Sequence, residues 1–224
     1  MNPVPKSTRW PGQHFLLLGL IAGALVIAHA DNPKPIEDSI KRLVAGNERY
    51  VAGTATHSNQ SAARRTEVAQ SQAPFATILG CADSRVSPEV VFDQGLGDLF
   101  VIRVAGNVVE DSGLGSIEYA VAHLHTPLLV VLGHERCGVM KAALEGGAAS
   151  GHVQTLVTAV SSAVTSTKGQ PGDALDNAVR ANVQRVVKQL QAAGPILNEA
   201  VKSGKLKIVG ARYDLDTGVV EFLP

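Results

Sequence analysis

The chain has 224 residues, of which 45% are hydrophobic, and its 20 acidic side chains balance its 20 basic ones. This length is sufficient for one globular domain with a substantial core. The balanced charge gives no electrostatic basis for binding nucleic acid or an anionic membrane surface. With two cysteines in all, the chain is not a disulfide-rich scaffold.

The N-terminal segment has the pattern of a secretory signal peptide. Lys6 and Arg9 precede an uninterrupted apolar run of 14 residues, Phe15 to Ala28, which ends in Ala28-His29-Ala30. A membrane-spanning helix needs about 20 apolar residues. We therefore expect the segment to be removed rather than kept as a membrane anchor.

Cleavage would produce a mature chain that begins at Asp31. We predict a cleaved signal peptide over residues 1–30 and a single domain over residues 31–224, exported to the periplasm. The absence of an Arg-Arg pair upstream of the apolar run favours the Sec route, and the absence of a cysteine near the cleavage site excludes a lipoprotein anchor. The mature chain would carry a net charge of −2, so we expect no nucleic-acid partner and no membrane partner after cleavage.

Hydrophobic periodicity predicts alternating helices and strands along the rest of the chain. Helices are expected at 36–52, 61–71, 112–125, 151–167 and 173–193, and two more should open at Ser87-Pro88-Glu89 and at Cys137-Gly138. Short apolar runs typical of buried strands occupy 75–80, 99–104 and 128–133, and a hairpin is expected from 206–213 and 218–222.

This order predicts an α/β fold with a mostly parallel central β-sheet flanked by helices. Ligands of such sheets bind outside the carboxyl ends of the strands. Cys81 follows the first predicted strand and His134 follows the third. We therefore expect both residues at one edge of the sheet.

Both cysteines lie in short motifs that contain other metal-binding residue types, Cys81-Ala82-Asp83-Ser84-Arg85 and His134-Glu135-Arg136-Cys137. Two thiolates, one imidazole and one carboxylate form a complete zinc ligand set. The alternatives are two buried apolar cysteines or, in an oxidising compartment, a single disulfide. Neither alternative needs His134, Asp83 and Arg85 beside the cysteines, so a zinc site is the favoured interpretation.

The two motifs, extended by Gly80, Gly133 and Gly138, resemble the signatures of the β-class carbonic anhydrases. The resemblance continues through Phe100-Val101-Ile102-Arg103, Ala105-Gly106-Asn107 and Ile117-Glu118-Tyr119-Ala120, and covers about residues 35–222. It implies the β-carbonic anhydrase fold, one Zn²⁺ per chain, and reversible hydration of carbon dioxide to bicarbonate and a proton by a zinc-bound hydroxide.

The resemblance also assigns roles at the metal. Cys81, His134 and Cys137 would be the permanent zinc ligands. Asp83, fixed by Arg85, would accept a hydrogen bond from the bound water or hydroxide, and in a closed, inactive state it would replace the water as fourth ligand. The alternative for Asp83 and Arg85 is an ordinary surface ion pair.

Four more residues are carried over by the resemblance to the substrate pocket. Gln72 would donate to bicarbonate, while Phe100, Ala105 and Tyr119 would line the pocket. In the family these groups come partly from a neighbouring subunit, which implies a homodimer or homotetramer. The alternatives are a solvated loop position for Gln72 and core positions for the other three.

The sequence departs from the family at one informative position. Some β-class enzymes have a second bicarbonate site with a tryptophan three residues before the first cysteine, a position held here by Ile78. We expect that site to be missing, although Arg103 resembles its arginine.

Three other functions compete with carbon dioxide hydration. They are hydrolysis of carbon disulfide or carbonyl sulfide, a non-catalytic exported zinc protein, and a Cys-His thiol nucleophile.

Overall fold

The computed structural model describes residues 35–146 and 149–224. The predicted signal peptide lies outside these residues. Within them, no helix is both long enough and apolar enough to cross a bilayer.

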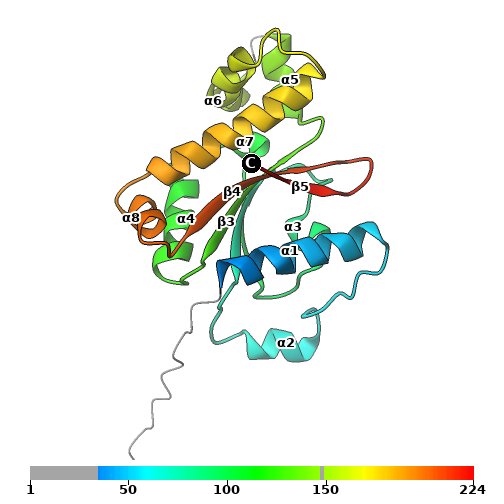
Figure 1. Cartoon of the computed structure of the whole chain (residues 1–224), viewed down its shortest axis with the longest axis vertical. Helices are drawn as coiled ribbons and strands as arrows, with labels where there is room; N and C mark the ends of the chain where they lie inside the picture. The colour runs from blue at the N-terminus through cyan, green and yellow to red at the C-terminus, as the bar shows by residue number, and fades with distance from the viewer. Residues whose placement is uncertain (1–34, 147–148) are drawn as a thin grey trace, which may run out of the picture. The chain divides into compact units, whose positions relative to one another are not determined.

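A five-stranded sheet forms the centre of the described domain (Figure 1). Its strands are β1 (Ala76–Gly80), β2 (Leu99–Arg103), β3 (Leu128–His134), β4 (Lys207–Tyr213) and β5 (Val220–Leu223). They pair in the order β2-β1-β3-β4-β5, with β1 to β4 parallel and β5 antiparallel to β4. The parallel sheet and the C-terminal hairpin are therefore confirmed.

The helices connect the strands and cover both faces of the sheet. They are α1 (Ile36–Val51), α2 (Ala62–Glu67), α3 (Pro88–Val91), α4 (Asp111–Ala122), α5 (Gly138–Glu145), α6 (Val153–Ser166), α7 (Ala174–Ala192) and α8 (Ile196–Lys202), with a short 3₁₀ turn, η1, at Ala105–Asn107. The parallel strands need such crossover connections because hairpins cannot join them.

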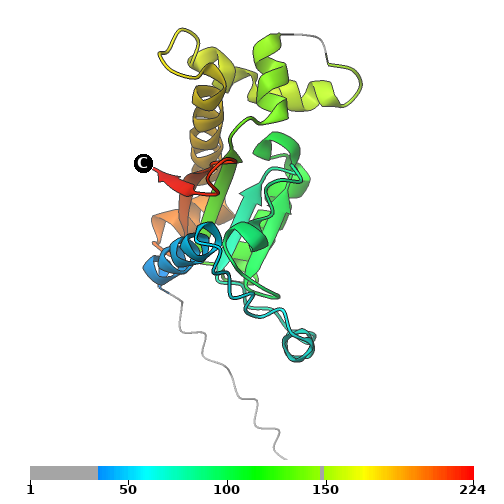
Figure 2. The ribbon, with the colours of Figure 1, turned by 90° about the vertical axis from the view of Figure 1, so that its right-hand side faces the viewer.

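Alternate residues of β3 enter different layers of the core. Leu128, Val130 and Leu132 pack in the cluster that contains Leu43 of α1, whereas Leu129 and Val131 pack in the cluster that contains Val183 of α7. Figures 1 and 2 show α1 and α7 on opposite faces of the sheet. All of β3 is buried as a result, which explains its continuous apolar sequence.

Two local predictions need correction, and one helix was not predicted. The helix expected over residues 61–71 is shorter, because α2 ends at Glu67. Ser87 holds the N-cap position of α3, but its hydroxyl donates to the Glu89 carboxylate at 3.4 Å instead of capping the helix backbone. Helix α8 has no counterpart among the elements expected from the sequence; it packs on α7 and α4.

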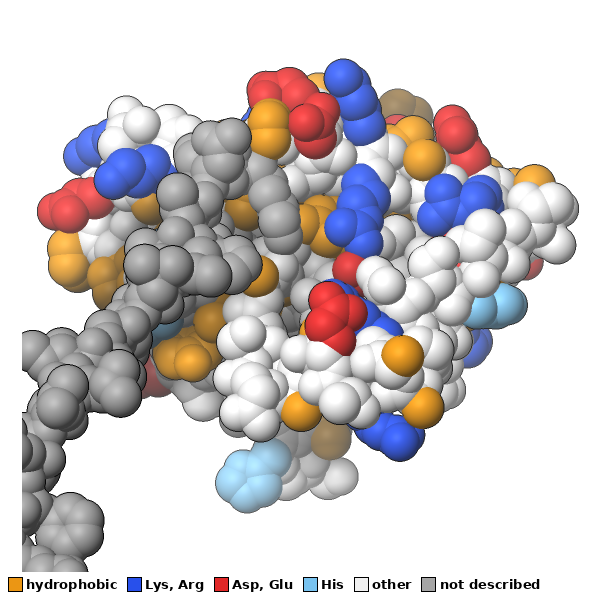
Figure 3. Space-filling model, turned by 90° about the horizontal axis from the view of Figure 1, so that it is seen from below, with side chains coloured by type: hydrophobic (Ala, Val, Ile, Leu, Met, Phe, Trp, Pro, Cys, Tyr) orange, Lys and Arg blue, Asp and Glu red, His pale blue; other side chains and the backbone are white. Residues whose placement is uncertain are grey.

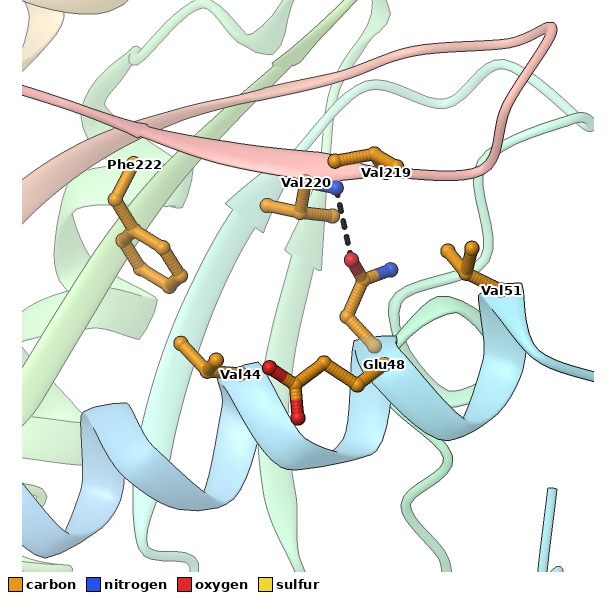
Figure 4. Close-up of a pocket in the computed structure, with 7 residues that line it drawn as sticks. Val44, Glu48, Val51, Val219, Val220 and Phe222 are labelled. Atoms are coloured by element: carbon orange, nitrogen blue, oxygen red, sulfur yellow. Dashed lines mark hydrogen bonds between the residues drawn. The ribbon is translucent and has the colours of Figure 1, made fainter. Parts of the chain in front are cut away.

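A groove runs between α1 and β5 (Figure 4). Val44, Val51 and Val219 line it and are partly exposed. Beneath them the buried side chain of Asn47 joins the two elements: its Oδ1 accepts from the Val220 amide at 2.8 Å, and its Nδ2 donates to the carbonyl of Gly218 at 2.8 Å. The hairpin is thereby fixed to the first helix.

Charged side chains of both signs are interspersed on the face seen in Figure 3. This distribution matches the equal numbers of acidic and basic residues in the sequence.

Candidate metal centre

The carboxyl ends of β1 and β3 bring the two sequence motifs together. Cys81 follows β1 directly, His134 is the last residue of β3, and Cys137 is the N-cap residue of α5. One ligand atom from each of these three buried residues lies within 4.8 Å of the other two. A tetrahedral zinc ion separates its sulfur and nitrogen ligands by roughly 3.5–3.8 Å, so the three side chains fit such an ion.

The imidazole of His134 is oriented for metal binding. Its Nδ1 lies 2.8 Å from the carbonyl oxygen of Glu135, which makes Nδ1 the protonated nitrogen and leaves a lone pair on Nε2. His134 is fully buried, and its Nε2 has no hydrogen-bond partner among the described residues. A buried unpaired nitrogen is costly, whereas a metal ion at this point would satisfy it.

The two cysteines are buried free thiols whose sulfur atoms lie within 4.8 Å of each other. A hydrogen bond from the Cys137 thiol lowers the pKa of Cys81. The same hydrogen bond, together with burial, raises the pKa of Cys137, because Cys137 must keep its proton to donate it. The Gly106 amide also donates to Cys81 Sγ at 3.2 Å. A divalent cation would compensate the charge of both thiolates.

Asp83 lies beside this group and is held by Arg85. The Arg85 guanidinium donates to Asp83 Oδ1 at 2.9 Å and to Oδ2 at 2.7 Å, and the Arg85 amide donates to Oδ1 at 3.0 Å. These contacts keep the pKa of Asp83 far below its usual range. The ionised carboxylate also points toward the candidate ligand group, because Oδ2 lies 3.7 Å from His134 Nε2.

Arg103 fixes the backbone that carries both Cys81 and Asp83. Its guanidinium donates to the Cys81 carbonyl at 3.0 Å and to the Asp83 carbonyl at 2.6 Å. Ile78, at the position where some family members have tryptophan, is fully buried in β1. Arg103 therefore has a structural role in this chain.

The predicted pocket residues are divided between the two ends of the sheet. Ala105 follows β2 at the metal end, next to Gly106. Phe100 pairs with Thr77 near the start of β1 and packs on the half-exposed Tyr119, with ring centroids 6.2 Å apart. Gln72 is exposed and precedes β1, a strand whose five residues span about 16 Å. A single chain thus keeps Gln72 away from its own metal ligands.

Comparison with known proteins identifies the family. The carbonic anhydrase family model matches residues 76–220. The chain is 44% identical over 182 residues to carbonic anhydrase 2 of Mycobacterium tuberculosis, covering 80% of this chain and 88% of that protein. The chain belongs to the β-class carbonic anhydrases.

Solved β-carbonic anhydrases have the same fold. The structure of a tetrameric β-carbonic anhydrase from Sordaria macrospora superimposes with a TM-score of 0.67 at 26% identity, covering 83% of this chain and 97% of that one. The structure of the Coccomyxa enzyme superimposes with a TM-score of 0.63 at 30% identity, covering 86% of each chain. Carbonic anhydrase activity, the interconversion of carbon dioxide and bicarbonate, follows from family membership.

Two groups around the centre of this carbonic anhydrase were missed in the sequence. Asn182 of α7 is fully buried and donates to the Gly106 carbonyl at 3.0 Å. Arg212 of β4 contacts the carboxylates of Glu135, Asp176 and Asp214. Both come from the C-terminal third of the chain, where no local motif marks them. Their contacts join residues that are far apart in the sequence, so only the three-dimensional structure reveals them.

Proposed function

We propose that the mature chain, residues 31–224, is a periplasmic zinc enzyme that hydrates carbon dioxide reversibly, with Cys81, His134 and Cys137 as the zinc ligands. The observation that carries the proposal is the buried, unpartnered Nε2 of His134 facing two thiols, beside a carboxylate held by Arg85. A protein with a purely structural zinc would have no need of the Asp83–Arg85 arrangement.

The residues around the ligands divide the remaining work. Zinc, when bound, lowers the pKa of water and so supplies a nucleophile near neutral pH. Asp83 remains ionised because of Arg85, so it would accept a hydrogen bond from a water or hydroxide held at this site and orient the lone pair of that oxygen toward the substrate. Arg103 holds the Asp83 carbonyl and keeps this carboxylate in place.

The surroundings of the cysteines suit a small apolar substrate. Val108, Met140 and Val160 are buried and pack in one cluster with Cys81 and Cys137. Such walls exclude water and leave carbon dioxide to be oriented by a small number of polar groups. Ala105 lies between Val104, which packs against this cluster, and Gly106, which donates to Cys81 Sγ, so it is the pocket residue that we place on the same chain as the metal ligands.

We further propose that the site is completed by a second subunit. Gln72 and the Phe100–Tyr119 pair lie toward the opposite end of the sheet from Cys81. They can reach a metal centre only if two chains associate as a homodimer or as a tetramer of dimers. The Sordaria macrospora relatives, which are tetrameric, support this assembly.

One experiment on the full-length chain tests the function. After export, mass spectrometry should find a chain that begins at Asp31, with one zinc per chain and stopped-flow hydration of carbon dioxide that increases from pH 7 to pH 9. Cys137→Ser should lose the zinc and, because metal binding contributes to folding, destabilise the domain. Parallel assays with carbon disulfide and carbonyl sulfide test the rival substrates.

Two results would overturn the proposal. Zinc-loaded wild type without hydration above buffer would leave the rival substrates or a structural zinc site as the function. Full zinc occupancy in Cys137→Ser would exclude the proposed ligand set.

A further inference from the structure

We propose that Asn182 of α7 is a positioning residue for the metal centre: it holds the Gly106 carbonyl so that the Gly106 amide donates to the sulfur of Cys81. This inference rests on the proposed function, since it takes Cys81 to be a zinc ligand. It assigns a role to a residue that lies 101 positions after Cys81 in the chain and does not belong to either sequence motif.

The backbone of Gly106 is held on both sides. Its amide donates to Cys81 Sγ at 3.2 Å, and its carbonyl accepts from Asn182 Nδ2 at 3.0 Å. The residue has a left-handed conformation, with φ 72° and ψ 15°, and an added Cβ would lie 3.2 Å from the side chain of Val139. The turn therefore depends on glycine and on its two hydrogen bonds to keep the amide directed at the sulfur.

The orientation of the Asn182 amide group is fixed by Arg185. Arg185 donates through Nε at 3.2 Å and through Nη2 at 2.9 Å, both to Asn182 Oδ1. Because a guanidinium can only donate, Oδ1 must face Arg185 and Nδ2 must face the Gly106 carbonyl. Within the described residues Arg185 forms no ion pair; its third hydrogen bond, from Nη1, goes to Gln189 Oε1 at 3.3 Å, so two of its three side-chain hydrogen bonds hold the Asn182 amide.

The hydrogen bond to the Cys81 sulfur affects the electronic properties of a metal ion held by two thiolates and one imidazole. Two thiolates offset the charge of Zn²⁺ and weaken its action as a Lewis acid. An N–H donor withdraws electron density from the thiolate, and hydrogen bonds to ligating sulfur tune metal centres in this way. Asn182 acts through Gly106, without contact to the metal or the substrate.

Cobalt-substituted protein provides a test that does not depend on activity. Loss of the N–H donor raises the energy of the sulfur lone pairs, so the thiolate-to-cobalt charge-transfer band should move to longer wavelength in Asn182→Leu and in Asn182→Asp. Zinc affinity, measured by competition with a chelator, should fall about 10-fold in both variants. Asn182→Asp retains an acceptor for Arg185, so it decides the question if Asn182→Leu does not fold.

Asn47 provides a matched control. It is also a buried asparagine whose Nδ2 donates to backbone carbonyls, but it joins α1 to the β5 hairpin. Asn47→Leu and Asn47→Asp should lower stability and leave the cobalt band and the zinc affinity unchanged. An unmoved band in folded Asn182 variants would overturn the positioning role alone. Wild type that binds neither cobalt nor zinc would overturn the proposed function as well.

Discussion

Both oxygens of the Asp83 carboxylate are held by Arg85, while Oδ2 also lies 3.7 Å from Nε2 of His134. The sequence motif predicted the pairing of these two residues. It did not reveal that Arg103 anchors the Asp83 carbonyl, because that contact joins the end of β2 to the loop after β1, 20 positions away in the chain. At the scale of single residues, local motifs therefore predict which side chains lie together, and the fold supplies the contacts that hold them.

Asp83→Asn should retain zinc and reduce the rate of hydration. The amide presents one fewer acceptor and turns a donor toward Arg85, so the nucleophile loses its oriented partner. We expect a 10- to 100-fold decrease in the stopped-flow rate at unchanged zinc content. Asp216→Asn is the control, because it breaks an exposed Arg–carboxylate pair of similar geometry, with Arg136. Equal activity in Asp83→Asn and wild type would exclude the proposed role.

Element boundaries show how far sequence periodicity extends in this chain. The expected strand at 128–133 matches β3 because it is buried on both faces and reads as one apolar run. The hairpin formed by β4 and β5 was also predicted. The seven residues of α8 were not, because so short a helix has little periodicity and is stabilised by packing on α7 and α4. The contact of α7 with β4, through Gly210, could not be predicted either.

Gly210→Ala should destabilise the domain through the packing of α7 on β4. An added Cβ would lie 2.7 Å from Val183 Cγ1, which overpacks the core at a cost of about 1–3 kcal/mol. Val183→Ala should remove that clash, so a double-mutant cycle by urea unfolding should show a favourable coupling of about 0.5–3 kcal/mol. Gly115→Ala in α4, where nothing lies within 4 Å of the added Cβ, should instead stabilise by up to about 1 kcal/mol. Additive effects of Gly210→Ala and Val183→Ala would contradict the proposed contact.

Arg212 connects the sheet, α7 and the loop after His134 into one unit of the molecule. Burial acts to raise the pKa of Asp176, but hydrogen bonds from Arg180 and Arg212 outweigh it and lower the pKa. A depressed carboxylate pKa stabilises the fold above the unfolded pKa of about 3.9, and this stabilisation is lost as the pH falls through the folded value.

Arg212→Met should therefore cost about 1.5–3 kcal/mol in urea unfolding at pH 7, because it leaves partly buried carboxylates without their partner. The difference between variant and wild type in the free energy of unfolding should be constant from pH 8 to pH 5. It should shrink below about pH 4, as these carboxylates become protonated. Arg65→Met, at an exposed position of α2, should have little effect at any pH. If this difference in the free energy of unfolding grows on acidification, the contacts of Arg212 with ionised carboxylates are not the source of the stabilisation.

Association of two chains makes a prediction for the whole molecule, because the metal ligands and Gln72 lie toward opposite ends of the sheet. Gln72→Ala should keep zinc but lose its donor to bicarbonate, whereas Cys137→Ser should lose zinc but keep Gln72. Each variant alone should be nearly inactive.

In a mixed dimer, the metal of the first chain meets Gln72 of the second, so one of the two sites is complete. Co-expression should therefore restore roughly a quarter of wild-type activity, as expected for random pairing of two chains in a symmetric dimer. Stopped-flow assay of the isolated mixed dimer, separated by two different affinity tags, should give about half the wild-type rate per dimer. If mixing restores nothing, Gln72 does not act across a subunit interface.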